Sequence, residues 1–198
     1  HYGNGLREVM RHDLANELHA IFVAPTFSQL PWYAAHPTDP SIRQEAHFLN
    51  VVVPFVESRY PARADTDGRL LLGFSKSGWG AWSLLLRHPE LFGKAVAWDA
   101  PLMMDKPGPF GSLPIFGTRE NFAEHQITKL LERRACELHE RQRLILLGYG
   151  NFRDQHETVH DNLLNLRIPH AYADGPSRKH TWDSGWLPEA AAQLLGRK

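Results

Sequence analysis

The chain has 198 residues, of which 42% are hydrophobic and 22% are charged. This length suffices for one domain with a sizeable core, and an aromatic content of 11% excludes a disordered chain. The formal net charge is zero, so we expect no overall attraction to nucleic acid or to an anionic membrane surface. No apolar run is long enough to span a bilayer, which favours a soluble protein and leaves its compartment open.

The single cysteine, Cys136, excludes a disulfide within the chain. It lies in a helical pattern with no residues nearby that would activate a thiol. We therefore predict a buried, structural side chain at this position.

Apolar runs typical of strands alternate with helical patterns. The predicted strands span residues 20–25, 69–74, 94–99, 143–148 and 169–173. The predicted helices span residues 5–18, 42–59, 78–87, 120–128, 128–141, 156–166 and 187–195, and a loop rich in proline and glycine spans 101–117. Continuously apolar strands separated by helices indicate a mostly parallel sheet with helices on both faces. We predict the α/β class, as a single domain over residues 1–198.

One strand runs directly into a tight turn before a helix, Gly73-Phe74-Ser75-Lys76-Ser77-Gly78. A G-x-S-x-G nucleophile elbow has this strand–turn–helix context, and residues two positions from its nucleophile have to be small. Gly73 and Ser77 meet that need, although glycine is usual at the second position. Ser75 would project above the sheet, and the backbone N–H of Lys76 would point at a developing oxyanion. The alternative is an ordinary turn in which Ser75 only caps the helix.

A serine nucleophile needs a base and an acid that orients it, and after such an elbow they follow in the order serine, acid, histidine. His180 lies between the last strand and the last helix, where the base is expected. Asp154 follows the preceding strand and is our first candidate for the acid, with helix capping as its alternative role. Asp99 directly follows an earlier strand and is the second candidate. Glu157 and Asp105 are weaker options.

Two histidines, His156 and His160, lie four residues apart on a predicted helix, which is a spacing that a metal pair can use. No third ligand follows at a fitting spacing. We predict no metal site and no cofactor.

The chain resembles the esterase D-like branch of the α/β-hydrolase superfamily in three places. These are the elbow from Gly73 to Gly80, the segment from Gly150 to Asp154, and His180-Thr181-Trp182 with Trp186. The resemblance extends over most of the chain, from about His1 to Leu195. It implies an α/β-hydrolase fold, a Ser-Asp-His triad and an acyl-enzyme intermediate in the cleavage of carboxylic esters. The family needs no metal or cofactor, and its partner is a small-molecule ester.

The resemblance also concerns the first residues, His1-Tyr2-Gly3-Asn4-Gly5, which are similar to the family's His-Gly-type loop. In the family this loop supplies the second oxyanion donor, so the resemblance implies the backbone N–H of Tyr2 or Gly3. Tyr2 stands where glycine is usual. The chain begins without a methionine and in what resembles a loop inside a domain, so we expect the N-terminal strands of the sheet to be missing.

Aromatic residues near the elbow and the loop at 101–117 are candidates for the substrate pocket, and we name Phe74, Trp79 and Trp98. For Trp79, packing in the core is the alternative. Two other functions remain open at this point: an acyltransferase that uses the same triad, and a non-catalytic protein that keeps the fold.

Overall fold

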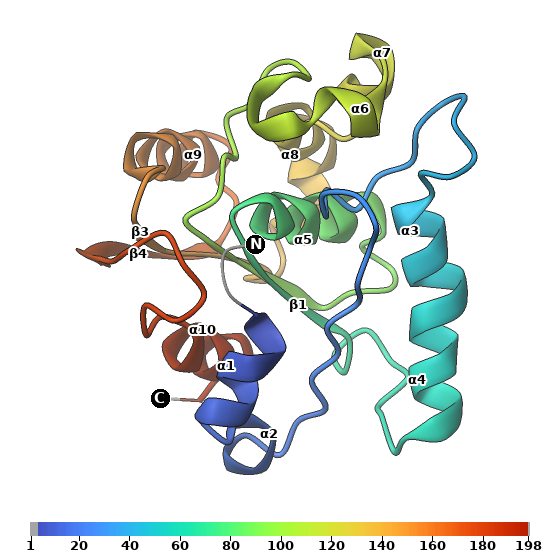
Figure 1. The fold of residues 1–198 in the computed structure, drawn as a ribbon. Helices are drawn as coiled ribbons and strands as arrows, with labels where there is room; N and C mark the ends of the chain where they lie inside the picture. The colour runs from blue at the N-terminus through green and yellow to red at the C-terminus, as the bar shows by residue number, and fades with distance from the viewer. Residues whose placement is uncertain (1–3, 198) are drawn as a thin grey trace.

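The computed structural model describes residues 4–197 and has a four-stranded sheet at its centre (Figure 1). The strands are β1 (Leu70–Phe74), β2 (Lys94–Trp98), β3 (Leu144–Tyr149) and β4 (His170–Ser177). They lie in the order β1-β2-β3-β4, and every neighbouring pair is parallel. The predicted parallel sheet is confirmed, and its strands present their carboxyl ends at one common edge.

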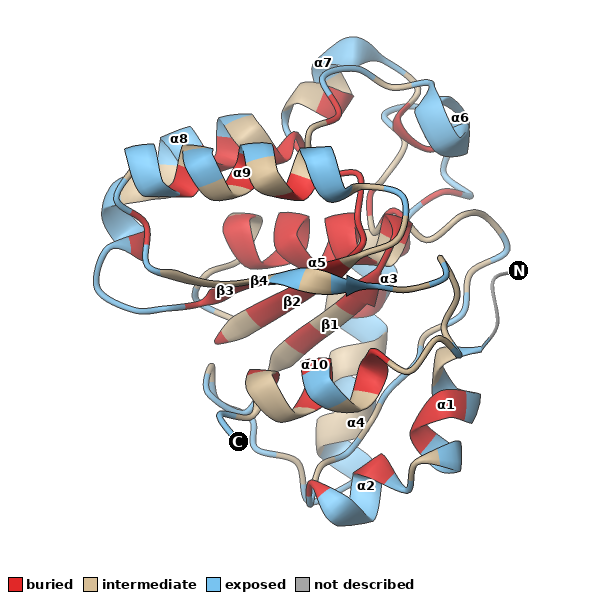
Figure 2. Ribbon diagram, turned by 90° about the vertical axis from the view of Figure 1, so that its left-hand side faces the viewer, coloured by how far each residue is buried: buried red, intermediate tan, exposed pale blue. Residues whose placement is uncertain are grey.

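Helices cover both faces of this sheet (Figure 2). One face carries α5 (Lys76–Arg87), α8 (Ile127–Leu138) and α9 (Arg153–Asn165), and the other carries α1 (Gly5–Arg11), α2 (Leu14–Glu17) and α10 (Leu187–Leu194). The remaining helical segments are α3 (Gln44–His47), a π-helical turn (Phe48–Val52), α4 (Val53–Arg59), a 3-10 turn (Pro109–Gly111), α6 (Leu113–Phe116) and α7 (Arg119–Ala123). Two helical layers around a parallel sheet give the α/β architecture that the sequence predicts.

The strands β1, β2 and β3 are largely apolar because each supplies side chains to two cores. In β2, Ala95 and Ala97 belong to the core under α5 and α8, whereas Val96 and Trp98 belong to the core under α10. All four side chains are buried. The period of two along a strand thus produces a continuous apolar run when both faces are covered.

The first predicted strand, residues 20–25, is wrong. This segment pairs with no strand among residues 4–197, and the only described neighbour of β1 in the sheet is β2. Phe22 packs against the core under α10, whereas Ile21 and Val23 are exposed at 46% and 45%. The apolar pattern was therefore real, but without a hydrogen-bonding neighbour it does not form a strand.

The prediction of a buried cysteine is also wrong, because the side chain of Cys136 is exposed on α8. The face of this helix that packs against the core contains Ile127, Leu130, Leu131 and Leu138. Cys136 lies off that apolar stripe, and this follows from the helical period of 3.6 residues.

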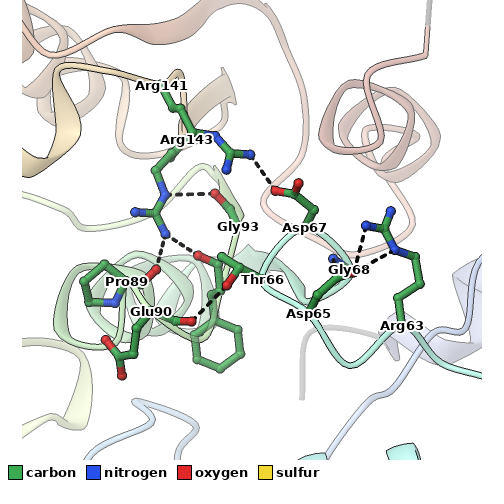
Figure 3. A network of polar contacts seen from close by, with 11 residues as sticks. Arg63, Asp65, Thr66, Asp67, Gly68, Pro89, Glu90, Gly93, Arg141 and Arg143 are labelled. Carbon is green, nitrogen blue, oxygen red and sulfur yellow. Dashed lines mark hydrogen bonds and ion pairs between the residues drawn. The ribbon is translucent and has the colours of Figure 1, made fainter.

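A polar network fixes the opposite edge of the sheet, at the amino ends of the strands (Figure 3). The guanidinium of Arg143 donates to the carbonyl oxygens of Gly93 at 3.0 Å and Pro89 at 2.6 Å, and also to that of Phe92. The side chain of Thr66 donates to the carbonyl of Glu90 at 2.9 Å. These bonds satisfy carbonyl groups in the turn between α5 and β2, so they stabilise the sheet far from the edge where its carboxyl ends meet.

Candidate active site

Three polar side chains meet beyond the carboxyl ends of the strands. Ser75 directly follows β1, Asp99 directly follows β2, and His180 lies in the loop after β4. Functional groups of open α/β sheets gather at this edge. The structure therefore joins two predicted residues, Ser75 and His180, with the second candidate for the acid.

The turn at Ser75 has the strained backbone of a nucleophile elbow, with φ 55° and ψ −122°. A Cβ atom on Gly73 would lie 2.0 Å from the carbonyl oxygen of Ser77, so only glycine fits there. A Cβ atom on Gly78 would lie 2.8 Å from the Cβ of Ala100. The lack of a side chain on Gly78 therefore allows the start of α5 to approach the segment after β2. The strain lifts the serine above the sheet and is maintained by this close packing.

Ser77, which occupies the position where glycine is usual, closes the elbow. Its hydroxyl donates to the carbonyl of Phe74 at 2.8 Å and accepts the N–H of the same residue at 3.0 Å. The N–H of Ser75 donates to the carbonyl of Trp98 at 3.1 Å, which ties the elbow to β2. The departure from glycine therefore adds hydrogen bonds to the turn without obstructing it.

A continuous hydrogen-bonded chain links the three side chains. The Oγ of Ser75 lies 3.1 Å from Nε2 of His180, and Nδ1 of His180 lies 2.5 Å from Oδ2 of Asp99. Ser75 is 6% exposed and Asp99 is fully buried, whereas the side chain of His180 keeps 16% of its surface exposed. With Nδ1–H donating to the carboxylate, Nε2 is left as the acceptor for the serine hydroxyl.

The carboxylate of Asp99 is also held by the loop after β3. It accepts the N–H of Asn151 at 2.9 Å and that of Phe152 at 2.8 Å. Burial alone would raise the pKa of Asp99, but His180 and the N–H groups of residues 150–152 outweigh it and lower the pKa below its usual value. Asp99 is therefore ionised at neutral pH and suited to orient a histidine and to stabilise its protonated form.

The expectation that Asp154 is the carboxylate beside the histidine is wrong. Asp154 lies in the first turn of α9 with its side chain exposed, and its carbonyl accepts the hydroxyl of Thr158 at 2.7 Å. The loop after β3 instead directs its N–H groups toward Asp99, so it supports an acid rather than supplying one. At this position the negative charge of Asp154 interacts favourably with the dipole at the N-terminus of α9.

The predicted pocket aromatics lie in the cores. Trp79 is 0% exposed and packs edge-to-face against Trp32 and Phe116, so the prediction that it contacts substrate is wrong. Phe74 and Trp98 are 3% and 2% exposed, which leaves almost no surface for a ligand. The ring of Phe74 instead packs against the imidazole of His180, with 4.4 Å between the ring centroids, and so helps to hold the imidazole in place.

Sequence reasoning missed an aromatic pair beside the histidine. The ring of Phe152 contacts His180 edge-to-face at 5.6 Å, and Phe110 contacts Phe152 in the same geometry at 5.2 Å. Phe110 has φ 54° and is 45% exposed. Phe110 therefore combines a strained backbone with an exposed ring that packs against Phe152. The flanking Gly108 and Gly111 in the Pro/Gly-rich loop were the signal that could have drawn attention to it.

Of the two predicted oxyanion donors, Lys76 is the first residue of α5, directly after Ser75. Its backbone N–H therefore belongs to the N-terminal turn of a helix, where the helix dipole favours negative charge. Burial lowers the pKa of its ammonium group. Tyr2, the other predicted donor, lies outside the described residues, as does Gly3.

The two histidines with metal-like spacing have separate partners. His156 accepts the N–H of Ala100 at 2.9 Å, and His160 lies 2.8 Å from His170, measured between Nδ1 and Nε2. Within residues 4–197, no three His, Cys, Asp or Glu side chains form a group that could hold a metal ion. In the same part of the chain, no helix has both the length and the apolar character needed to cross a membrane.

A parallel sheet covered on both faces, with a strained serine at the turn from strand to helix, defines a protein of the α/β-hydrolase class. Residues 24–167, well over half of the chain, match the family model Esterase, which is described as "Putative esterase". The chain belongs to this esterase family, and its enzyme class is that of the carboxylic ester hydrolases. The predicted family and enzyme class are thereby confirmed. Among curated proteins, no match is found.

Solved structures with the same fold include three hydrolases. An S-formylglutathione hydrolase from Agrobacterium tumefaciens is 14% identical with a TM-score of 0.72, over 96% of this chain and 78% of that one. A ferulic acid esterase is 18% identical with a TM-score of 0.69, over 97% and 76%. The fluorophosphonate-binding serine hydrolase F of Staphylococcus aureus is 22% identical with a TM-score of 0.58, over 75% and 62%. At these identities the likeness concerns the fold.

Proposed function

We propose that this protein cleaves carboxylic esters through a triad of Ser75, His180 and Asp99 and a covalent acyl-enzyme. The observation that carries the proposal is the continuous chain from Ser75 Oγ through both nitrogens of His180 to the buried carboxylate of Asp99. Membership of the esterase family supports the same chemistry. Such an arrangement makes a weak hydroxyl nucleophile reactive, since the proton can leave as the new bond forms.

In the acylation step, Nε2 of His180 takes the hydroxyl proton as Ser75 Oγ attacks the ester carbonyl carbon. The carbonyl electron pair moves to the oxygen, and the backbone N–H of Lys76 stabilises the resulting oxyanion. The resemblance to the esterase D-like branch adds the N–H of Tyr2 or Gly3 as the second donor. The tetrahedral intermediate then expels the alcohol, which takes its proton from His180 and leaves the acyl group on Ser75.

Water completes the cycle by the same route. His180 removes a proton from a water molecule while the oxygen of that water attacks the acyl carbon. The Oγ of Ser75 then leaves the acyl carbon and takes the proton back from His180. Asp99 stays ionised throughout and stabilises the imidazolium that forms in both steps. Each cycle therefore converts one ester and one water into one acid and one alcohol.

The first test replaces the nucleophile. Ser75→Ala should abolish labelling by a fluorophosphonate probe and reduce kcat for p-nitrophenyl acetate by ~10⁶-fold, because it removes the hydroxyl that lies 3.1 Å from Nε2 of His180. Ser58→Ala, on the exposed side of α4, is the matched control and should label fully. Full labelling and turnover in Ser75→Ala would refute the proposal.

The second test compares the two acids. Asp99→Asn should lower kcat by ~10⁴-fold, since an amide no longer holds the histidine in the correct tautomer. Asp154→Asn should leave kcat within about twofold, because that side chain is exposed in the first turn of α9. The opposite ranking would assign the acid to Asp154.

Addition of an acceptor alcohol separates hydrolysis from acyl transfer, because strong acceleration is expected only of a transferase.

A further inference from the structure

The imidazole of His156 is a buried titratable group that the proposed chemistry does not use. It lies on α9 and is 2% exposed. Its Nε2 accepts the N–H of Ala100 at 2.9 Å, whereas its Nδ1 has no hydrogen-bond partner among the described residues. Burial lowers the pKa of His156 to about 4, so the ring is neutral near pH 7. An acceptor at Nε2 requires the proton to be on Nδ1.

The peptide group that His156 holds directly follows Asp99. Asp99 has φ 42°, in the left-handed region that costs free energy for residues other than glycine. The direction of the Ala100 N–H is set by the ψ angle of Asp99, and the same residue carries the carboxylate that meets His180. A bond that fixes this N–H therefore also restricts how the carboxylate is presented.

The segment after β2 and the start of α9 hold each other in both directions. The carboxylate of Asp99 accepts N–H groups from Asn151 and Phe152, just before α9. In return, α9 side chains accept N–H groups from the segment after β2, through His156 to Ala100 and through Gln155 to Met103 at 3.0 Å. The acid is thus fixed through both its side chain and its backbone.

We propose that His156 is a positioning residue for the esterase reaction, which acts by holding the Ala100 N–H and thereby the turn that directs Asp99 at His180. This rests on the proposed function. A histidine that served packing alone would affect the stability of the fold and leave the geometry of the acid unchanged.

The decisive experiment compares His156→Gln with His156→Asn, two polar side chains that differ by one methylene group. The Gln amide oxygen reaches about as far as Nε2 and should accept the Ala100 N–H, whereas the Asn oxygen stops near the position of Nδ1. We expect His156→Asn to lower kcat by ~10²-fold with KM within about twofold, since the defect lies in the alignment of the acid. His156→Gln should retain kcat within about fivefold of the unchanged protein.

A spectroscopic readout makes the test independent of turnover. The Nδ1 proton between His180 and Asp99 should give a low-field proton NMR resonance because the hydrogen bond is short. This resonance should be displaced or lost in His156→Asn and kept in His156→Gln. Its presence does not depend on Ser75 being the nucleophile, so failure of the proposed function and failure of this inference are distinguishable.

The control for stability is Val159→Ala, which opens a cavity at a fully buried position of the same helix. It should lower the melting temperature while keeping both kcat and the low-field resonance. Equal kcat and equal resonances in the Asn and Gln variants would overturn the inference. So would a loss of kcat in Val159→Ala as large as that in His156→Asn, because general destabilisation would then explain both.

Discussion

Gly150 lies in the loop after β3, close to the carboxylate of Asp99. A Cβ atom there would lie 2.6 Å from Oδ2 of Asp99 and 2.7 Å from the carbonyl oxygen of Arg178. Gly150→Ala should therefore push the carboxylate away from His180 and lower kcat for p-nitrophenyl acetate by ~10²-fold. Steady-state kinetics of the folded variant, checked by circular dichroism, measures this effect.

Gly93→Ala is the matched control for that substitution. A Cβ atom on Gly93 would lie 2.5 Å from the carbonyl oxygen of Thr66, which is a comparable clash at the opposite edge of the sheet. It should reduce stability and leave kcat of the folded protein near its original value. An unchanged kcat in Gly150→Ala would show that the carboxylate tolerates displacement.

At this scale the sequence predicted two of the three residues in the hydrogen-bonded chain. Ser75 was found because the elbow needs small residues at fixed spacing, and His180 because it lies in the loop after the last strand. The acid was not, since two aspartates follow strands and the sequence does not say which strand end faces the histidine. In the structure Asp99 follows its strand with no intervening residue, whereas Asp154 lies within α9, which begins earlier than the helix predicted from residue 156.

At the scale of the elements, the 3-10 turn Pro109–Gly111 exposes the ring of Phe110 to solvent. This ring packs against Phe152, which in turn contacts His180. We expect this ring to contact an apolar group of the ester. Phe110→Ala should lower kcat/KM for p-nitrophenyl phenylacetate by ~2–10-fold more than for p-nitrophenyl acetate, as expected for the loss of one aromatic contact. The two substrates share a leaving group, so their ratio reports the acyl side alone.

Leu164→Ala serves as the control for Phe110→Ala, because Leu164 is 56% exposed on α9 and also offers an apolar side chain to solvent. It should leave the ratio of the two kcat/KM values unchanged. A ratio unchanged in Phe110→Ala as well would place the acyl group elsewhere.

The elements were predicted best where periodicity and packing agree. The strands from 69 to 74 and from 94 to 99 match β1 and β2 within one residue, because both faces are buried and the apolar run ends at the turn. The last strand was predicted to end at residue 173 and continues to Ser177, since a register irregularity between Leu147 and Tyr149 allows Tyr149 to pair with Ser177. Such an irregularity depends on the neighbouring strand, so local sequence does not reveal it.

For the whole molecule, the two cores place the site at the edge where the sheet and both helical layers meet. The elbow begins α5 on one face, while Phe74 and Trp98 pack into the core on the other, against Trp186 at the start of α10. His180 is therefore supported from the core under α10, and Asp99 from α9 on the opposite face. Both cores therefore help to support the site, whose residues come from separate parts of the chain.

The same burial makes the stability of the whole protein dependent on pH. His125 and His156 are 6% and 2% exposed, and burial lowers the pKa of each to about 4, from an ordinary value of 6.5. Both rings are neutral in the folded protein above about pH 4, whereas in the unfolded chain they take up protons once the pH falls below 6.5. Their contribution is present in full above pH 6.5 and is lost as the pH falls toward 4, by up to ~1.4 kcal/mol per pH unit for each.

We therefore expect the free energy of unfolding, measured by urea denaturation, to fall steadily between pH 7 and pH 4.5. His156→Gln should make this slope shallower, because one of the buried rings that lose stability on protonation is removed. His19→Gln changes an exposed histidine and should leave the slope as it is. A free energy of unfolding that stays constant from pH 7 to pH 5 in the unchanged protein would mean that the buried rings take up protons without loss of the fold. In that case His156 would carry protons on both ring nitrogens in the folded protein at pH 5 and could no longer accept the Ala100 N–H.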